Sequence, residues 1–298
     1  MNLLAIQEHW FWKYTFGKNR LFSKSLEKNE LRKNIKLSLF LFYGLLYFVL
    51  IDYLFVISTD LIFEPITNPE WALFWTKLFD FGYWHIVFLA VSLVTNTICF
   101  LDIGSSSKRA VNFVSFFLLF SALNSYPKIS HGLHVLLIPM FFFCFISIKN
   151  NATYKNAIVF ASAIVTFLLS YTMAGFWKIM TGVYHLYIGD KSNFDSDVMS
   201  RMILYKFKYD EPTVLSQWFI DHPNIGYILF WSGVIIEFLA VFIFFIPKLH
   251  RVWGLALILF HIGIANLMVI HYKYAIIVII PLLLCTPFLN NKFVTVEN

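Results

Sequence analysis

Residues 157–178 read AIVFASAIVTFLLSYTMAGFWK, an apolar run that ends in a lysine. A helix of about 20 apolar residues is long enough to cross the hydrocarbon core of a bilayer. A lysine at the end of such a helix either reaches the lipid headgroups as an anchor or stays inside the protein to do chemistry. The segment therefore indicates a membrane fold and makes Lys178 a candidate site residue.

The composition of the whole chain supports a membrane location. Of its 298 residues 59% are hydrophobic and only 13% are charged, whereas soluble domains contain about 25% charged residues. The net charge of +6 is concentrated before residue 37 and in short loops. Because the Lys and Arg residues do not form one basic face, we expect membrane lipids as partners and no nucleic acid.

Eight apolar segments are candidates for spans, which predicts an all-α fold, a polytopic membrane bundle of about eight transmembrane helices. The third, fourth and eighth are short, and Pro281 and Pro287 should kink or shorten the last one. The segments are 37–58, 81–102, 110–126, 131–148, 157–178, 224–246, 252–271 and 274–290.

The loops predict the orientation of the bundle. If both termini are cytoplasmic, 15 of the 23 Lys and Arg lie on the cytoplasmic side, as expected for a membrane protein. We treat 37–290 as one transmembrane domain with external loops at 59–80 and 179–223 and a short tail at 291–298. Residues 1–36 are interpreted either as an interfacial helix or as a basic cap on the first span.

Ionisable side chains inside spans are candidate functional residues, because hydrocarbon offers them no partners. Most of those found here fall in the external half of the predicted bundle. Each also has a structural interpretation, as an anchor, a packing pair or a polar helix end. Two histidines one turn apart do not make a metal site, which needs three or four ligands. The candidates are Asp52, His85, His131, His134, Lys178, Glu237 and His261.

The residues before Lys178 suggest how a ligand could reach it. Tyr171, Ala174 and Lys178 are spaced i, i+3 and i+7, so they share one face of a helix. Gly175 has no side chain and allows another helix or a flat ligand to approach. An amine flanked by aromatic residues would be partly desolvated, and desolvation disfavours the ammonium form. This environment would suit a lysine that acts as a base.

Three stretches together resemble one known family: SHGLHVLLIPMFFF (130–143), YTMAGFWK (171–178) and IEFLAVFIFFIPKLHRVWGLALILFHIGI (236–264). In this order they resemble the membrane domain shared by vitamin K-dependent γ-glutamyl carboxylase and its bacterial HTTM relatives. The bacterial set includes proteins that mature sporulation-delaying-type toxin peptides. The resemblance covers roughly residues 35–290 and implies a bacterial inner-membrane protein.

The resemblance also implies roles for particular residues. In the carboxylase a lysine deprotonates a reduced quinone, oxygen adds, and the strong base that results activates a glutamate for reaction with carbon dioxide. Lys178 corresponds to that lysine, and His131 corresponds to a histidine that supports the oxyanion. The stretch after Lys178, KIMTGVYHL, departs from the family pattern, and the chain ends soon after its last predicted span. We therefore expect another substrate or a partner protein to supply recognition.

Two functions remain open from the sequence. The first is a quinol-dependent membrane enzyme, with Lys178 and His131 as catalytic residues, acting on an extracytoplasmic peptide or small molecule. The second is a non-catalytic accessory protein for maturation or secretion of a peptide. Paired broken helices and repeat symmetry, which indicate transporters, are not evident in the sequence. The predicted pocket around the catalytic pair comprises Tyr171, Ala174, Gly175, His134, Glu237 and His261.

Overall fold

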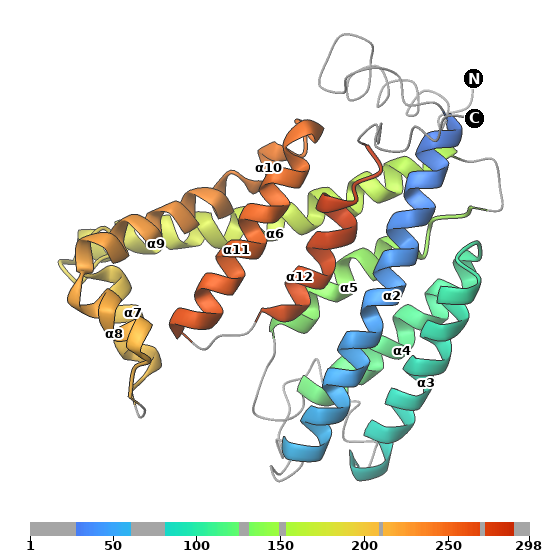
Figure 1. The fold of residues 1–298 in the computed structure, drawn as a ribbon, viewed down its shortest axis with the longest axis horizontal. Helices are drawn as coiled ribbons and strands as arrows, with labels where there is room; N and C mark the ends of the chain where they lie inside the picture. The colour runs from blue at the N-terminus through green and yellow to red at the C-terminus, as the bar shows by residue number, and fades with distance from the viewer. Residues whose placement is uncertain are drawn as a thin grey trace.

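The computed structural model describes residues 28–60, 81–124, 131–148, 153–208, 211–268 and 272–288. In these ranges all regular secondary structure is helical (Figure 1), which confirms the all-α part of the predicted fold class. The elements are α2 (Lys28–Asp60), α3 (Phe81–Leu101), α4 (Ser106–Asn124), α5 (His131–Phe143), α6 (Thr153–Ile188), α7 (Val198–Lys206), α8 (Val214–Asp221), α9 (Pro223–Phe238), α10 (Ala240–Ile243), η2 (Pro247–Leu249), α11 (His250–Met268), α12 (Lys273–Ile279) and η3 (Ile280–Leu284).

Three helical segments are long and apolar enough to cross a membrane: Asn29–Phe55, Lys155–Ile188 and Pro247–Met268. Shorter apolar helices accompany them at Ile86–Leu101, Leu133–Phe143, Pro223–Phe238 and Lys273–Leu284. Every apolar segment predicted from the sequence contains a helix. The last one changes from α-helix to π-helix at Ile280, next to Pro281, as expected for a residue that lacks a backbone N–H.

The long helix α6 corrects two predicted boundaries. It continues to Ile188, ten residues beyond Lys178, so this lysine does not lie at a helix end. The helix stops where Gly189 adopts a φ of 76° and the amide of Asp190 donates to His185 O at 2.9 Å, a common left-handed helix end. The predicted external loop 179–223 therefore contains the last part of α6 together with α7 and α8.

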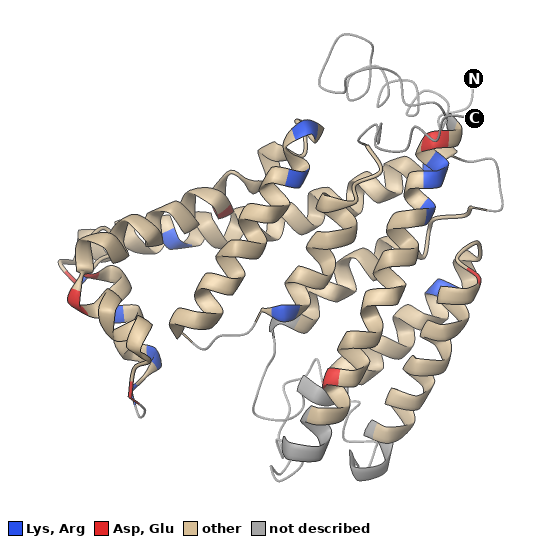
Figure 2. Ribbon diagram, in the orientation of Figure 1, with Lys and Arg blue, Asp and Glu red and all other residues tan. Residues whose placement is uncertain are grey.

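The described surface is apolar and parts of the interior are polar. Large apolar side chains such as Phe48, Phe55 and Leu101 are exposed, while Asn96 and Arg109 are fully buried. Figure 2 shows long stretches of helix without charge between charged ends. Large exposed apolar surfaces mark contact with another apolar phase. This distribution is compatible with a membrane protein whose outer side chains face lipid.

Arginines gather several helix ends at one end of the bundle. Arg32 of α2 donates to Ile148 O at 2.7 Å, just beyond α5. Arg109 of α4 donates to Phe143 O at 2.7 Å and also to the carbonyls of Ile103 and Ile146. Arg251 of α11 donates to Leu284 O at the end of η3, at 3.1 Å. The last carbonyls of a helix lack partners within the helix. The three arginines donate to carbonyls in and just beyond such helix ends and so hold these ends together.

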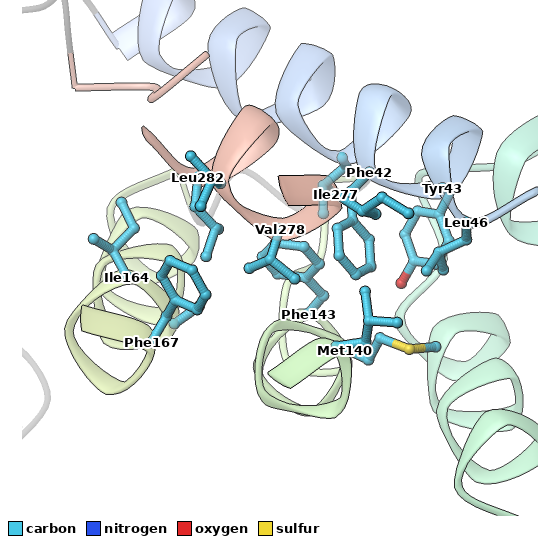
Figure 3. Packing of buried hydrophobic residues seen from close by; sticks show 14 of the residues in the cluster. Phe42, Tyr43, Leu46, Met140, Phe143, Ile164, Phe167, Ile277, Val278 and Leu282 are labelled. Atoms are coloured by element: carbon cyan, nitrogen blue, oxygen red, sulfur yellow. The ribbon is translucent and has the colours of Figure 1, made fainter. Parts of the chain in front are cut away.

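The main core lies between α2, α5, α6, α12 and η3. Figure 3 shows Phe42 of α2 close to Ile277 and Val278 of α12 and to Phe143 of α5. A smaller cluster joins α7, α9 and the end of α11; its buried members are Val198, Met199, Ile203, Phe230, Val234, Leu267 and Met268. Polar side chains, among them Lys178, Glu237 and His261, lie where α6, α9 and α11 meet.

Candidate functional site

Lys178 makes an ion pair between two helices. Its Nζ lies 2.5 Å from Glu237 Oε2, joining α6 to α9, and it is 5.7 Å from the centre of the Phe260 ring on α11. The Glu237 side chain is 7% exposed and that of Lys178 is 29% exposed. The pair is therefore closed on the glutamate side and open on the lysine side. This contact favours an interior role for Lys178 over that of a headgroup anchor.

The close approach of α6 and α9 depends on Gly175. A Cβ at this position would lie 2.6 Å from Phe238 N and 3.1 Å from Glu237 Cβ. Gly175 thus admits the end of α9, one of the two partners that the sequence left open. Because Gly175 lies one turn before Lys178, this contact brings Glu237 within reach of the amine.

Thr172 secures the same region of α9. The chain leaves the α-helix at Leu239, between α9 and α10. The hydroxyl of Thr172 accepts a hydrogen bond from the backbone N–H of Val241 at 2.9 Å and donates to Glu237 O at 3.4 Å. These bonds pair backbone groups near the break and hold the residue that carries the carboxylate. Thr172 could not be predicted from the sequence, because a threonine in an apolar helix gives no signal of its distant partner.

A second polar pair lies beside the first. Tyr171 Oη and His261 Nε2 are 2.5 Å apart, and both side chains are buried. Tyr171 is two helical turns before Lys178 on α6, and His261 follows Phe260, which contacts Lys178. The Tyr272 ring is 5.3 Å from that of His261. The two pairs therefore form one cluster, which we call the α6–α9–α11 site: Tyr171, Lys178, Glu237, Phe260, His261 and Tyr272.

His261 contributes a polar atom that its protein neighbours do not use. Its side chain is 5% exposed, and Nδ1 makes no hydrogen bond to any part of the chain that the structure describes. The hydrogen bond with Tyr171 uses only Nε2. In neutral histidine one ring nitrogen carries the proton and the other accepts, so Nδ1 can take either role towards a ligand. Nδ1 is thus available to donate to, or accept from, a hydroxyl or carbonyl group.

The chemistry available to this site is proton transfer. An amine and a carboxylate 2.5 Å apart share a strong, charge-assisted hydrogen bond. In a low-dielectric environment the charged and neutral forms of such a pair are closer in free energy than in water. Glu237 can therefore take a proton from Lys178, which leaves a neutral amine able to accept another proton. Phe260 keeps one side of the amine apolar.

The remaining predicted residues are placed differently. Ala174 is exposed on α6, and His134 is exposed near the start of α5. The side chains of His131 and His85 lie outside the described residues, so the expected meeting of His131 and Lys178 stays a prediction. Asp52 binds Lys273 and the Tyr274 hydroxyl, which supports its interpretation as a packing pair between α2 and α12. Within the described ranges, no group of three or more His, Cys, Asp or Glu could hold a metal ion.

Comparisons with known proteins give no relative for this chain: no family model, no curated protein and no solved structure matches it.

Proposed function

We propose that the chain is an integral membrane enzyme similar to the HTTM and carboxylase membrane domains, in which Lys178 and Glu237 move a proton. The single observation that carries the proposal is the Nζ–Oε2 contact of 2.5 Å between two largely apolar helices. A charged pair at such a place is costly unless its geometry is good. Function is the usual reason for ionisable residues inside membrane helices.

The proposed topology has eight spans with both termini in the cytoplasm. Hydrogen bonds from arginines support this topology. They join the starts of α2, α4 and α11 to the ends of α5 and η3, and alternating spans would place all these ends on the same side of the membrane. Asp52, late in α2, contacts Lys273 at the start of α12, as expected for the opposite side. In this topology α7 and α8 are external and lie beyond the outer end of α6.

In the proposed reaction, each residue of the α6–α9–α11 site has a separate role. Glu237 accepts the proton of Lys178, and the neutral amine then acts as a general base towards an acidic hydroxyl. Tyr171 fixes the ring of His261 through Nε2. His261 Nδ1 is left to orient the ligand hydroxyl. Phe260 covers one side of the amine with an apolar ring.

A reduced quinone is the cofactor that fits these residues. His261 Nδ1 is a buried polar atom without a partner among the described residues, and Phe260 and Tyr272 offer aromatic faces beside it. Lys178, His261 and Tyr272 would hold the quinone. When bound, such a group supplies an acidic hydroxyl and two electrons that dioxygen can accept. The substrate that we propose is an extracytoplasmic peptide or small molecule, with recognition by a partner protein.

The experiment uses the purified protein in nanodiscs, with menadiol as the reduced quinone and menadione as the oxidised one. We expect menadione to raise the unfolding temperature, since a ligand that binds the folded state stabilises it. We expect menadiol oxidation to be faster than in empty nanodiscs and to be lost in Glu237→Gln. If neither quinone shifts the unfolding temperature and oxidation equals that of empty nanodiscs, the accessory-protein interpretation is favoured.

A further inference from the structure

Six polar residues form a continuous seam between α2, α3 and α4, away from the α6–α9–α11 site. We call it the polar seam: Tyr43, Ser92, Thr95, Asn96, Asn112 and Ser115. Asn96 Nδ2 donates to Tyr43 O at 3.1 Å, which joins α3 to α2. Asn112 Nδ2 donates to Thr95 Oγ1 at 3.1 Å, and the hydroxyls of Thr95 and Ser115 are 2.9 Å apart, which joins α3 to α4.

Four atoms of the polar seam are buried without a partner. They are Tyr43 Oη, Ser92 Oγ, Asn96 Oδ1 and Asn112 Oδ1, none of which hydrogen-bonds to the described parts of the protein. All four residues are 0% exposed. Ser92 and Asn96 are one turn apart on α3, so they share a face. Figure 3 shows the Tyr43 hydroxyl directed away from the α2 backbone.

Buried polar atoms are nearly always hydrogen-bonded. Lipid provides no such bonds, and in a membrane helix each group left unsatisfied is costly. Four unpartnered atoms on three neighbouring helices therefore indicate hydrogen-bonding partners that the described side chains do not supply. Such partners must both donate and accept.

The charges around the polar seam select the kind of ligand. The six seam residues contain no carboxylate, and all six are neutral. Arg109, one turn before Asn112 on α4, is fully buried and brings a positive charge. A cation would have to lose its hydration next to this charge with no anion to compensate it. An anion would find the Arg109 guanidinium already bonded to three carbonyls.

We infer that the polar seam is a binding site for a small cluster of buried water molecules, which complete the hydrogen bonds of Tyr43, Ser92, Asn96 and Asn112. A buried water makes two to four hydrogen bonds, typically about three, so a few waters can serve all four atoms. The waters bridge α2, α3 and α4 in a region where direct side-chain contacts leave these groups unpaired. The site is independent of the proposed enzyme function.

Removal of single hydroxyls tests this site, because bound water and a dry site predict opposite changes in the unfolding temperature. Tyr43→Phe and Ser92→Ala delete one unpartnered atom each and keep most of the side-chain shape. If water is bound there, each variant loses a hydrogen bond, and the unfolding temperature in nanodiscs falls by about 2–4 °C. If the atoms are dry, deletion removes an unmet polar group, and the unfolding temperature rises. A rise overturns the proposal.

Ser121→Ala is the matched control. Its buried hydroxyl donates to Phe117 O at 2.7 Å within its own helix, and this carbonyl keeps its backbone hydrogen bond when the hydroxyl is removed, while alanine favours the helix. Its unfolding temperature should differ from that of the unmodified protein by less than either seam variant. A density map of the unmodified protein that resolves ordered water provides the second measurement. We expect peaks about 2.7–3.2 Å from Asn96 Oδ1 and Asn112 Oδ1. If the map shows only apolar atoms next to Asn96 Oδ1 and Asn112 Oδ1, or a peak at about 2.4 Å as for a coordinated cation, the proposal is overturned.

Discussion

Lys178 on α6 and Glu237 on α9 face each other at 2.5 Å because Gly175, one turn before the lysine, lets the two helices approach closely. The ion pair and the helix contact are therefore one feature. A larger residue at 175 would push away the helix that carries the carboxylate. The first prediction concerns this glycine.

Gly175→Ala should destabilise the protein by about 1–3 kcal/mol, the usual cost of overpacking a tight contact. The added Cβ would meet the backbone of Phe238, which cannot rotate away as a side chain can. Gly263→Ala on α11 is the control, since its Cβ would have nothing within 4 Å and alanine favours helix by up to about 1 kcal/mol. Unfolding in detergent compares the two; equal effects would contradict the role of Gly175.

The second prediction concerns the coupling between Lys178 and Glu237. Glu237→Leu leaves the Lys178 ammonium without its partner and should cost about 3 kcal/mol, as for a broken buried ion pair. The double variant with Lys178→Met removes both charges and should recover much of that loss. A double-mutant cycle measures this coupling. Simple additivity of the two single effects would show that the ion pair contributes nothing to folding.

The third prediction concerns Arg109, which was not among the candidate residues predicted from the sequence. Its guanidinium serves three carbonyls while fully buried. Arg109→Lys keeps the charge but not the planar set of donors, so we expect a loss of about 2 kcal/mol or more. Lys108→Met is the control, because the Lys108–Asp102 pair is partly exposed and solvent-exposed ion pairs contribute about 0–1 kcal/mol. A similar loss for both variants would contradict the carbonyl-binding role.

The fourth prediction concerns topology. In a background without Cys99, Cys144 and Cys285, Lys191→Cys should react with a membrane-impermeant maleimide in intact cells. Lys248→Cys should react only after permeabilisation. Both positions are exposed, so burial does not prevent labelling at either one. The opposite pattern would invert the proposed orientation.

The helices were predictable because about 20 apolar residues between basic loops leave few alternatives. Each predicted span contains a helix, and the proline-disturbed end of the last one was also predicted. The end of α6 at Gly189 was missed, because a lysine at the end of a span-length apolar run predicts a boundary. The residues that follow, 179–188, are mostly apolar and continue the helix to Ile188. In the site, Tyr171, Lys178, Glu237 and His261 were all candidates, but their pairing depends on helix packing that a single sequence does not encode locally. Thr172, Phe260 and the arginine contacts with carbonyls were missed for the same reason.

The most direct test of the central claim is menadiol oxidation by Lys178→Arg in nanodiscs. Arginine can keep the ion pair with Glu237 and reach the headgroups, but its guanidinium stays protonated and cannot act as a base. We predict that Lys178→Arg folds, inserts and is stabilised by menadione like the unmodified protein. Its turnover should nevertheless fall by about 10²–10⁴-fold, the usual loss for a general base. Full turnover with arginine at this position would contradict proton transfer by Lys178 and would leave the ion pair with a structural role.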